Sequence, residues 1–178
     1  MSTSSPSRVR EFDFTQADFD SLRTLVKEQS GITLGEAKRE LVYGRVSRRL
    51  RALGLSAFAD YRRMLAGPEG QAEMIEFINA VTTNLTSFFR ESHHFDFLRD
   101  DYLRQKVADA KGSRRLRIWC SAASTGEEPY SIAISVAEAI PEWERWDIRI
   151  LATDLDTNVL QTCVNGVYGE DRVRGMQK

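Results

Sequence analysis

The apolar residues between positions 12 and 109 recur three or four residues apart, which predicts helices throughout this region. Thr15 and Asp18 have the spacing of a capping box, which predicts the start of the first helix. This helix is expected to end at Gly31. A second helix is expected from about Glu36 to Leu53. Three further helices are expected to carry apolar stripes: Phe58, Tyr61 and Leu65 after a cap at Ser56; Met74, Ile75, Ile78 and Val81; and Phe95, Leu98, Tyr102 and Leu103 from a start at Ser92.

The pattern changes after the polar segment 109–115, whose Gly-Ser step indicates a domain boundary. Leu116, Ile118 and Cys120 then alternate with their neighbours, which predicts a short strand buried on at least one face. A loop of small residues, a helix over 128–139, a strand over 148–153 and a helix capped by Thr157 and ended by Gly166 are expected to follow. This order predicts the opening of a parallel α/β sheet. Because two parallel strands leave open edges, the chain is expected to be truncated or to continue naturally.

Composition and charge narrow the class of protein. The 178 residues are 42% apolar and 29% charged, with a formal net charge of −1, which favours a globular protein without a general attraction to nucleic acid or membranes. Residues 1–11 lack the apolar core of a secretion signal and are expected to be a disordered lead-in of a cytoplasmic protein. Cys120 and Cys163 are expected to be reduced core thiols. No metal site is expected, because the adjacent His93 and His94 point about 100° apart on a helix.

The loop between the first predicted strand and its helix has an unusual composition for a nucleotide site. It holds small residues and one glycine, Gly126, and it ends in Glu127 and Glu128. In an open α/β sheet a ligand binds at this point, and two acids there would repel a diphosphate. They suit a ligand with hydroxyls or positive charge, and S-adenosylmethionine has both. The alternative is that the two acids only stabilise the helix dipole.

A second acidic position follows the other predicted strand. Asp154 is expected at the tip of that strand, where an acid accepts hydrogen bonds from ribose hydroxyls. The alternative is that Asp154 or Asp156 caps the next helix, and Asp156 fits the cap better because it adjoins Thr157.

Three segments carry a family resemblance when they are taken in order. They are residues 84–91 (NLTSFFRE), 121–131 (SAASTGEEPYS) and 152–157 (ATDLDT). Together they resemble the CheR family of bacterial chemotaxis protein-glutamate O-methyltransferases, over the chain from about Phe12. The resemblance implies a small all-helical N-terminal domain over 12–110. An incomplete Rossmann-like class I S-adenosylmethionine methyltransferase domain is implied over 115–178.

The resemblance also implies an activity. The family esterifies glutamate side chains in the cytoplasmic helices of methyl-accepting chemotaxis receptors with S-adenosylmethionine. A cytoplasmic monomer that binds no nucleic acid and does not insert into a membrane is expected. The family's later cofactor loop, its FCRN-type strand and its small β-subdomain are absent from these residues, so it stays open whether the chain methylates alone.

By resemblance, five residues are expected to contact the cofactor: Asn84, Thr86, Arg90, Glu128 and Asp154. Without the resemblance, Arg90 would be interpreted as a solvated arginine beside a helix, and Asn84 and Thr86 as ordinary turn and cap residues. The choice of Glu128 over Glu127 stays open. Arg90 is the candidate catalytic residue, since its fork suits either the carboxylate of the cofactor or the substrate glutamate. The neighbouring Phe88 and Phe89 are expected to be core residues.

One face of the second predicted helix is basic. Arg45, Arg48 and Arg49 lie at helical spacing opposite the apolar stripe. They are predicted to dock an acidic partner, and receptor methylation helices are rich in glutamate. The alternative is a solvated polar face.

Two other functions are compatible with the sequence. One is a nicotinamide-dependent oxidoreductase with a degenerate loop, against which the missing glycines argue. The other is a non-catalytic module that docks receptors through the basic helix.

Overall fold

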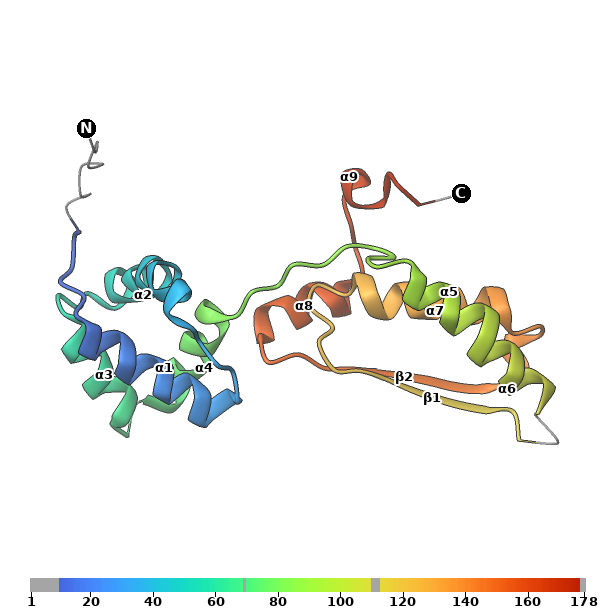
Figure 1. Cartoon of the computed structure of the whole chain (residues 1–178), viewed down its shortest axis with the longest axis horizontal. Coiled ribbons are helices and arrows are strands. Elements are labelled where there is room, and N and C mark those ends of the chain that lie inside the picture. The colour runs from blue at the N-terminus through green and yellow to red at the C-terminus, as the bar shows by residue number, and fades with distance from the viewer. Residues whose placement is uncertain (1–9, 69, 110–112, 177–178) are drawn as a thin grey trace. The chain divides into compact units, whose positions relative to one another are not determined.

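A computed structural model describes residues 10–68, 70–109 and 113–176 of the protein. The chain forms two compact units that divide between Thr82 and Thr83 (Figure 1). The lead-in expected over 1–11 lies outside the described residues except at Arg10 and Glu11. Arg10 forms an ion pair with Glu40, so the expected disorder does not extend to it.

The described part of the first unit is helical, as the sequence predicts. Its elements are α1 (Gln16–Ser30), η1 (Glu36–Lys38), α2 (Arg39–Leu53), α3 (Phe58–Ala66) and α4 (Gly70–Val81). They enclose one apolar core whose fully buried members include Phe19, Leu22, Val42, Val46, Leu50, Tyr61 and Phe77.

Local chemistry explains the ends of α1. The Thr15 hydroxyl accepts a hydrogen bond from the Asp18 amide at 3.1 Å, and the Asp18 carboxylate accepts one from the Thr15 amide at 3.0 Å. This reciprocal pair satisfies two amides that a helix start leaves unpaired. Gly31 ends the helix with φ 75°, a conformation that favours glycine. The predicted capping box and stop are confirmed.

Two details of the predicted helices are wrong. Ala57 rather than Ser56 precedes α3, with no side-chain cap. Ile75 is 51% exposed, and Phe77 is buried on the core face of α4 instead. Glu73 and Phe77 lie four residues apart on that face, and Ile75 points away from both because neighbouring helix positions diverge.

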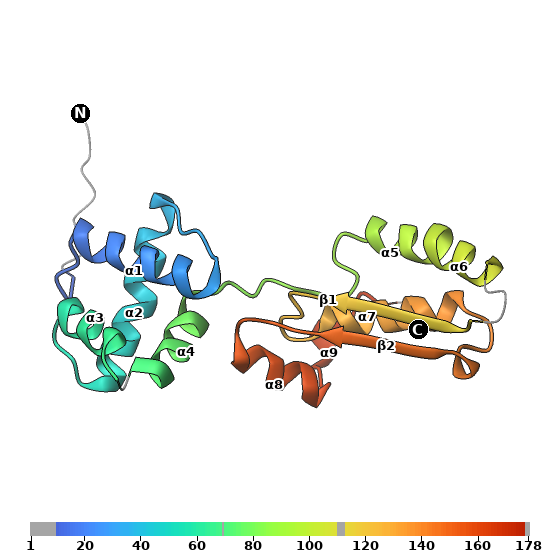
Figure 2. The same cartoon turned by 90° about the horizontal axis from the view of Figure 1, so that it is seen from below.

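The second unit begins with a helical stretch and continues as an α/β arrangement. Its elements are α5 (His93–Phe97), the π-helical η2 (Leu98–Leu103), α6 (Arg104–Ala108), β1 (Arg115–Cys120), α7 (Glu127–Ala139), η3 (Trp143–Arg145), β2 (Asp147–Ala152), α8 (Thr157–Asn165) and α9 (Glu170–Val173). The two strands pair in parallel from Arg115↔Asp147 to Cys120↔Ala152. Helix α7 connects them and lies along one face of the pair (Figure 2).

The two faces of the strand pair differ in burial. Leu116 and Cys120 are buried on the face toward α7, which confirms the predicted half-buried strand. On the other face Trp119 is 67% exposed and Leu151 is 59% exposed. Among the described residues no helix is both long and apolar enough to cross a bilayer.

The units do not divide at 109–115, where the sequence analysis placed the boundary and where residues 110–112 lie outside the described residues. Phe95 and Leu103 are buried with Leu116 and Ile132 in the core of the second unit. Helices α5 and α6 therefore belong to the α/β unit. Their apolar period matches that of the preceding helices, so periodicity alone could not separate them.

The π-helical stretch corrects a further prediction. Tyr102 was expected on the apolar stripe but is 47% exposed, whereas Leu103 is fully buried. In a π-helix the backbone hydrogen bonds join residues five apart instead of four. The next buried position after Leu98 is therefore Leu103 and not Tyr102.

Of the two caps that the sequence analysis offered for α8, Thr157 is wrong and Asp156 is right. Its cap is Asp156, whose carboxylate accepts a hydrogen bond from the Asn158 amide at 3.0 Å, and Thr157 is its first residue. Gly166 ends it with φ 61°, as predicted.

Candidate functional site

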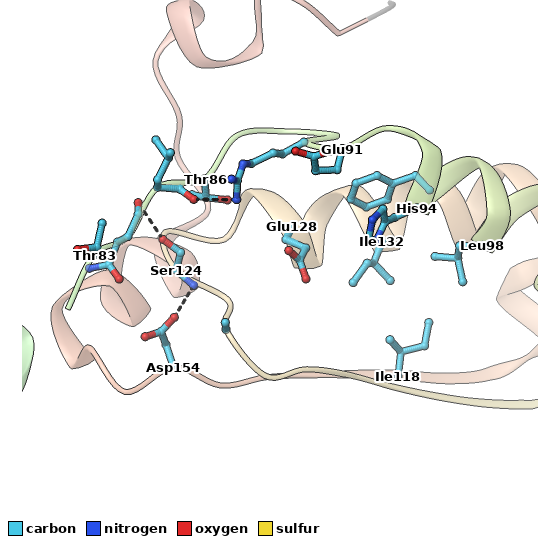
Figure 3. A pocket seen from close by; sticks show the side chains of 15 residues that line it. Thr83, Thr86, Glu91, His94, Leu98, Ile118, Ser124, Glu128, Ile132 and Asp154 are labelled. Carbon is cyan, nitrogen blue, oxygen red and sulfur yellow. Dashed lines mark hydrogen bonds between the residues drawn. The ribbon is translucent and has the colours of Figure 1, made fainter. Parts of the chain in front are cut away.

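A cavity of about 550 Å³ lies in the second unit beside the carboxyl ends of β1 and β2 (Figure 3). This volume falls within the range of about 300–1,000 Å³ that is usual for small-molecule sites. The cavity is lined by all five residues for which the sequence analysis predicted cofactor contact: Asn84, Thr86, Arg90, Glu128 and Asp154. Phe95, Leu98, Ile118 and Ile132 form its apolar part.

Hydrogen bonds tie the polar side of the cavity together. The Asp154 carboxylate accepts a hydrogen bond from the Ser124 amide at 2.7 Å through one oxygen (Figure 3). Its other oxygen accepts one from the Asp156 amide at 2.9 Å. The Asn84 side-chain amide donates to Asp156 at 2.6 Å, and the Ser124 hydroxyl donates to the Asn84 carbonyl at 3.4 Å. Three segments far apart in sequence are therefore joined. Each oxygen of Asp154 keeps a further lone pair for a ligand hydroxyl.

The structure separates the roles of the two aspartates after β2. Asp154 lines the cavity, while Asp156 is only 4% exposed and caps α8. The preference for Asp156 as the cap is confirmed.

The structure also separates the two glutamates at the start of α7. Glu128 is exposed and lines the cavity, where it accepts a hydrogen bond from the Cys120 thiol at 3.3 Å. Burial, reinforced by this carboxylate, raises the pKa of Cys120 to about 12. Glu127 is fully buried, accepts a hydrogen bond from the Thr125 hydroxyl at 2.6 Å and pairs with Arg172. Of the two acids, only Glu128 lines the cavity.

The Glu127 carboxyl is held in its charged form by its partners. Burial is the largest influence and would raise its pKa. The hydrogen bonds from Thr125 and Arg172 outweigh burial and leave the pKa below its ordinary value. Glu127 therefore contributes a buried charge that is already compensated, which is a structural role.

Arg90 is exposed at the cavity, where its guanidinium makes one long hydrogen bond of 3.4 Å to the Leu85 carbonyl. Among the residues that the structure describes, no carboxylate lies within ion-pair distance of it. The guanidinium fork therefore remains available to a ligand carboxylate.

The segment that carries Arg90 has a strained backbone. Phe89 and Glu91 have φ of 50° and 56°, and Ser124 across the cavity has φ of 50°. Such conformations are rare for residues other than glycine and gather at functional sites. The Phe89 amide donates to the Ser131 hydroxyl at 3.0 Å, which helps to hold this segment in place.

Of the two phenylalanines predicted to be core residues, Phe89 packs against the core of the second unit, whereas Phe88 is half-buried outside that core. The Phe89 ring meets Phe95 edge-on with centroids 5.2 Å apart, and Phe88 meets Tyr168 at 5.0 Å. Cys120 and Cys163 are free and buried, which confirms the prediction of core thiols.

Several site residues were missed from the sequence. Ser124 contributes its backbone amide, and small residues in the loop indicated only a close approach of the backbone. Tyr168 and Arg172 reach the cavity loops from beyond α8, and nothing in their local sequence indicates this. Across the described part of the chain, no group of three His, Cys, Asp or Glu side chains could hold a metal ion.

The basic face of α2, predicted to dock an acidic partner, is largely engaged within the helical unit, and its docking role stays a prediction. The Arg45 guanidinium donates to the Ala80 carbonyl at 3.1 Å and to the Thr82 carbonyl. Arg49 donates two hydrogen bonds to Glu73, at 2.9 and 2.6 Å. Of these three arginines, Arg48 is the one whose side chain is exposed. Helical spacing identifies residues on one side of a helix, but not whether a neighbouring helix supplies their partners.

Family models match each of the two compact units of the chain. Residues 17–82 match the family model described as "CheR methyltransferase, all-alpha domain", and residues 84–178 match "CheR methyltransferase, SAM binding domain". The match to the second model begins two residues after the division between the compact units.

Named relatives match over most of the chain. It is 47% identical to "Chemotaxis protein methyltransferase 2" of Pseudomonas aeruginosa, over 99% of this chain and 61% of the relative. It is 45% identical to "Chemotaxis protein methyltransferase" of Salmonella typhimurium, over 86% of this chain and 51% of the relative. It is 40% identical to the "Chemotaxis protein methyltransferase" of Escherichia coli, over 91% of this chain and 54% of the relative. The chain thus spans about half to three fifths of these relatives, and the matches to both family models show that it belongs to the CheR methyltransferase family.

Proposed function

We propose that this chain carries the cofactor site of an S-adenosylmethionine-dependent protein-glutamate O-methyltransferase. The observation that carries the proposal is the pair of acids at the two strand tips. Glu128 after β1 and Asp154 after β2 line one cavity that lacks a glycine-rich diphosphate loop. Such a cavity favours a nucleoside with hydroxyls and positive charge over a dinucleotide.

The lining residues fit S-adenosylmethionine in chemical type. The carboxylates of Glu128 and Asp154 would accept hydrogen bonds from the ribose hydroxyls or the ammonium group of the cofactor. Arg90 offers a fork for a carboxylate, either that of the cofactor or that of a substrate glutamate. The bound cofactor supplies a methyl group on a positively charged sulfur.

The proposed reaction does not require a strong general base from the protein. A substrate glutamate is already anionic near neutral pH, since a free glutamate has a pKa of about 4.3. With the cofactor bound, this carboxylate could accept the methyl group from the sulfonium without transfer of a proton to or from the protein. The protein therefore contributes alignment of the two reactants and removal of water from the carboxylate.

The protein substrate that we propose is the cytoplasmic, glutamate-bearing helix of a membrane chemoreceptor, methylated in the cytoplasm. Support comes from the relatives, which are named as chemotaxis protein methyltransferases. Within the face predicted to dock this helix, Arg48 is the residue whose side chain is exposed, so we assign any such contact to it. A purely docking module has less support, because Arg45 and Arg49 are engaged within the helical unit.

Calorimetry tests the cofactor assignment. The chain is expected to bind S-adenosylhomocysteine and not NAD. Glu128→Gln should weaken binding by about tenfold or more, because a hydrogen bond to a charged group contributes about 1.5–3 kcal/mol. Glu138→Gln, an exposed acid further along α7, is the matched control. No binding by the unaltered chain, or equal binding by both variants, would contradict the assignment.

A further inference from the structure

The segment that follows α8 is bound to the loops of the cavity. The Tyr168 hydroxyl donates to the Thr125 carbonyl at 2.7 Å, and the Tyr168 ring packs edge-on against Phe88. Gly126 allows this approach: its φ is 105°, and a Cβ there would lie 2.3 Å from the Tyr168 hydroxyl oxygen. The segment therefore touches the loop after β1 and the segment 83–91 at the same time.

Arg172, on α9, makes a second connection between the same two parts. One guanidinium nitrogen donates to the buried Glu127 carboxylate and also to the Thr86 carbonyl at 3.3 Å. Glu127 begins α7 directly after the loop, and Thr86 lines the cavity from the opposite segment. A single side chain thus joins the first turn of α7, next to the cavity-lining Glu128, to the segment that carries Thr86.

We propose that Arg172 is a positioning residue for the cofactor, held by Glu127 so that it fixes the Thr86 segment against the loop after β1. That the ligand is S-adenosylmethionine rests on the proposed function. The joining of the two segments does not.

The chemistry of the pair explains why both residues are needed. The Glu127 side chain is 1% exposed, so it requires a partner: a buried carboxylate left alone is strongly unfavourable. Arg172 keeps 44% of its side chain exposed and lies outside the cavity lining, so it does not itself need to contact the ligand. Both bonds come from one guanidinium nitrogen, whose two N–H groups are held in the plane of the group. A lysine ammonium rotates freely on a flexible stem and does not hold two acceptors in one fixed geometry.

The test compares Arg172→Gln, Arg172→Lys and the control Arg174→Gln, an exposed arginine two residues further on. Three quantities are measured for each variant. Amide hydrogen exchange of residues 84–91 and 121–126 is measured without ligand. The urea midpoint of the second unit is measured by tryptophan fluorescence, and the affinity for S-adenosylhomocysteine by calorimetry. Arg172→Gln should speed exchange in both segments and weaken binding by about tenfold or more, since small misplacements of binding groups have large effects. Arg172→Lys keeps the charge pair and should restore the urea midpoint, but it should not restore the affinity or the slow exchange of 84–91. Arg174→Gln should leave all three unchanged.

Two results would overturn the inference. One is unchanged exchange of residues 84–91 in Arg172→Gln. The other is full recovery of affinity and exchange in Arg172→Lys, which would reduce the pair to a contribution to stability. Failure of the unaltered chain to bind S-adenosylhomocysteine would instead count against the proposed function, and the exchange measurement would still decide the inference.

Discussion

The contact between Arg49 and Glu73 offers a direct test of how the basic face of α2 is used. Glu73 is buried, with 8% of its side chain exposed, and it accepts two hydrogen bonds from Arg49 and one from the Tyr61 hydroxyl at 2.7 Å. Burial, followed by the contact with Glu73, raises the pKa of Tyr61 well above its ordinary value. Replacing Arg49 with methionine keeps the bulk of the stem and removes the countercharge of a buried carboxylate.

The expected loss of stability is about 3 kcal/mol. Removing one partner of a buried ion pair typically costs about 3–5 kcal/mol. The Arg49 side chain is 24% exposed and Tyr61 continues to donate to Glu73, so the lower end of that range is expected. With an m-value of about 1 kcal/mol/M for a unit of this size, the urea midpoint of the first unit should fall by about 3 M. Arg49→Met combined with Glu73→Gln removes the unpaired charge, keeps an acceptor for Tyr61 and should recover at least half of the loss.

The distribution of tryptophans supplies an internal control. All three tryptophans lie in the second unit: Trp119, Trp143 and Trp146. Far-ultraviolet circular dichroism should therefore show the loss of the first unit at lower urea, while the fluorescence transition stays in place. Arg48→Met, one residue away and exposed, is the matched control. Equal circular dichroism midpoints for Arg48→Met and Arg49→Met would refute the reasoning and return Arg49 to the set of residues available for docking.

Three further predictions use the same two transitions. Thr15→Ala removes the capping box with Asp18 and should cost about 1 kcal/mol in the circular dichroism transition; a change near zero would show that the cap is dispensable. Gly126→Ala places a Cβ 2.3 Å from the Tyr168 hydroxyl oxygen at φ 105° and should lower the free energy of unfolding, followed by fluorescence, by about 1–3 kcal/mol. An unchanged free energy of unfolding would show that the loop adjusts to the side chain. The pKa of Cys120 is raised to about 12, so the stability of the second unit that depends on the neutral thiol is present below about pH 8.5, the unfolded value, and is lost as pH rises toward 12. Cys120→Ala should flatten this decline, and an unchanged slope would contradict it.

Much of the fold follows from local signals that the structure reproduces. The Thr15 capping box and the glycine stops at Gly31 and Gly166 depend on a few neighbouring residues, and each is observed. The boundary between the units was not predictable in this way. It depends on which core buries Phe95 and Leu103, and that is decided by contacts with the distant strand β1 and helix α7.

The cavity was largely predictable because of sheet geometry. Parallel strands end at the same edge, so Glu128 after the first and Asp154 after the second had to lie near each other. The path of the chain after α8 has no such rule, and the bond from Arg172 to the Thr86 carbonyl therefore had no signal in the sequence. The engagement of Arg49 by Glu73 was missed for the same reason, since the two lie 24 residues apart.

The π-helical stretch Leu98–Leu103 carries a consequence for insertions and deletions in this helix. Leu98 and Leu103 both face the core across five positions, one more than an α-helix needs between residues on one face. Deleting the exposed Tyr102 should convert the stretch to ordinary α-helix with both leucines still in register. The same deletion in an α-helix would rotate every later residue by about 100°. This helix is thus expected to tolerate a change of length that its neighbours would not.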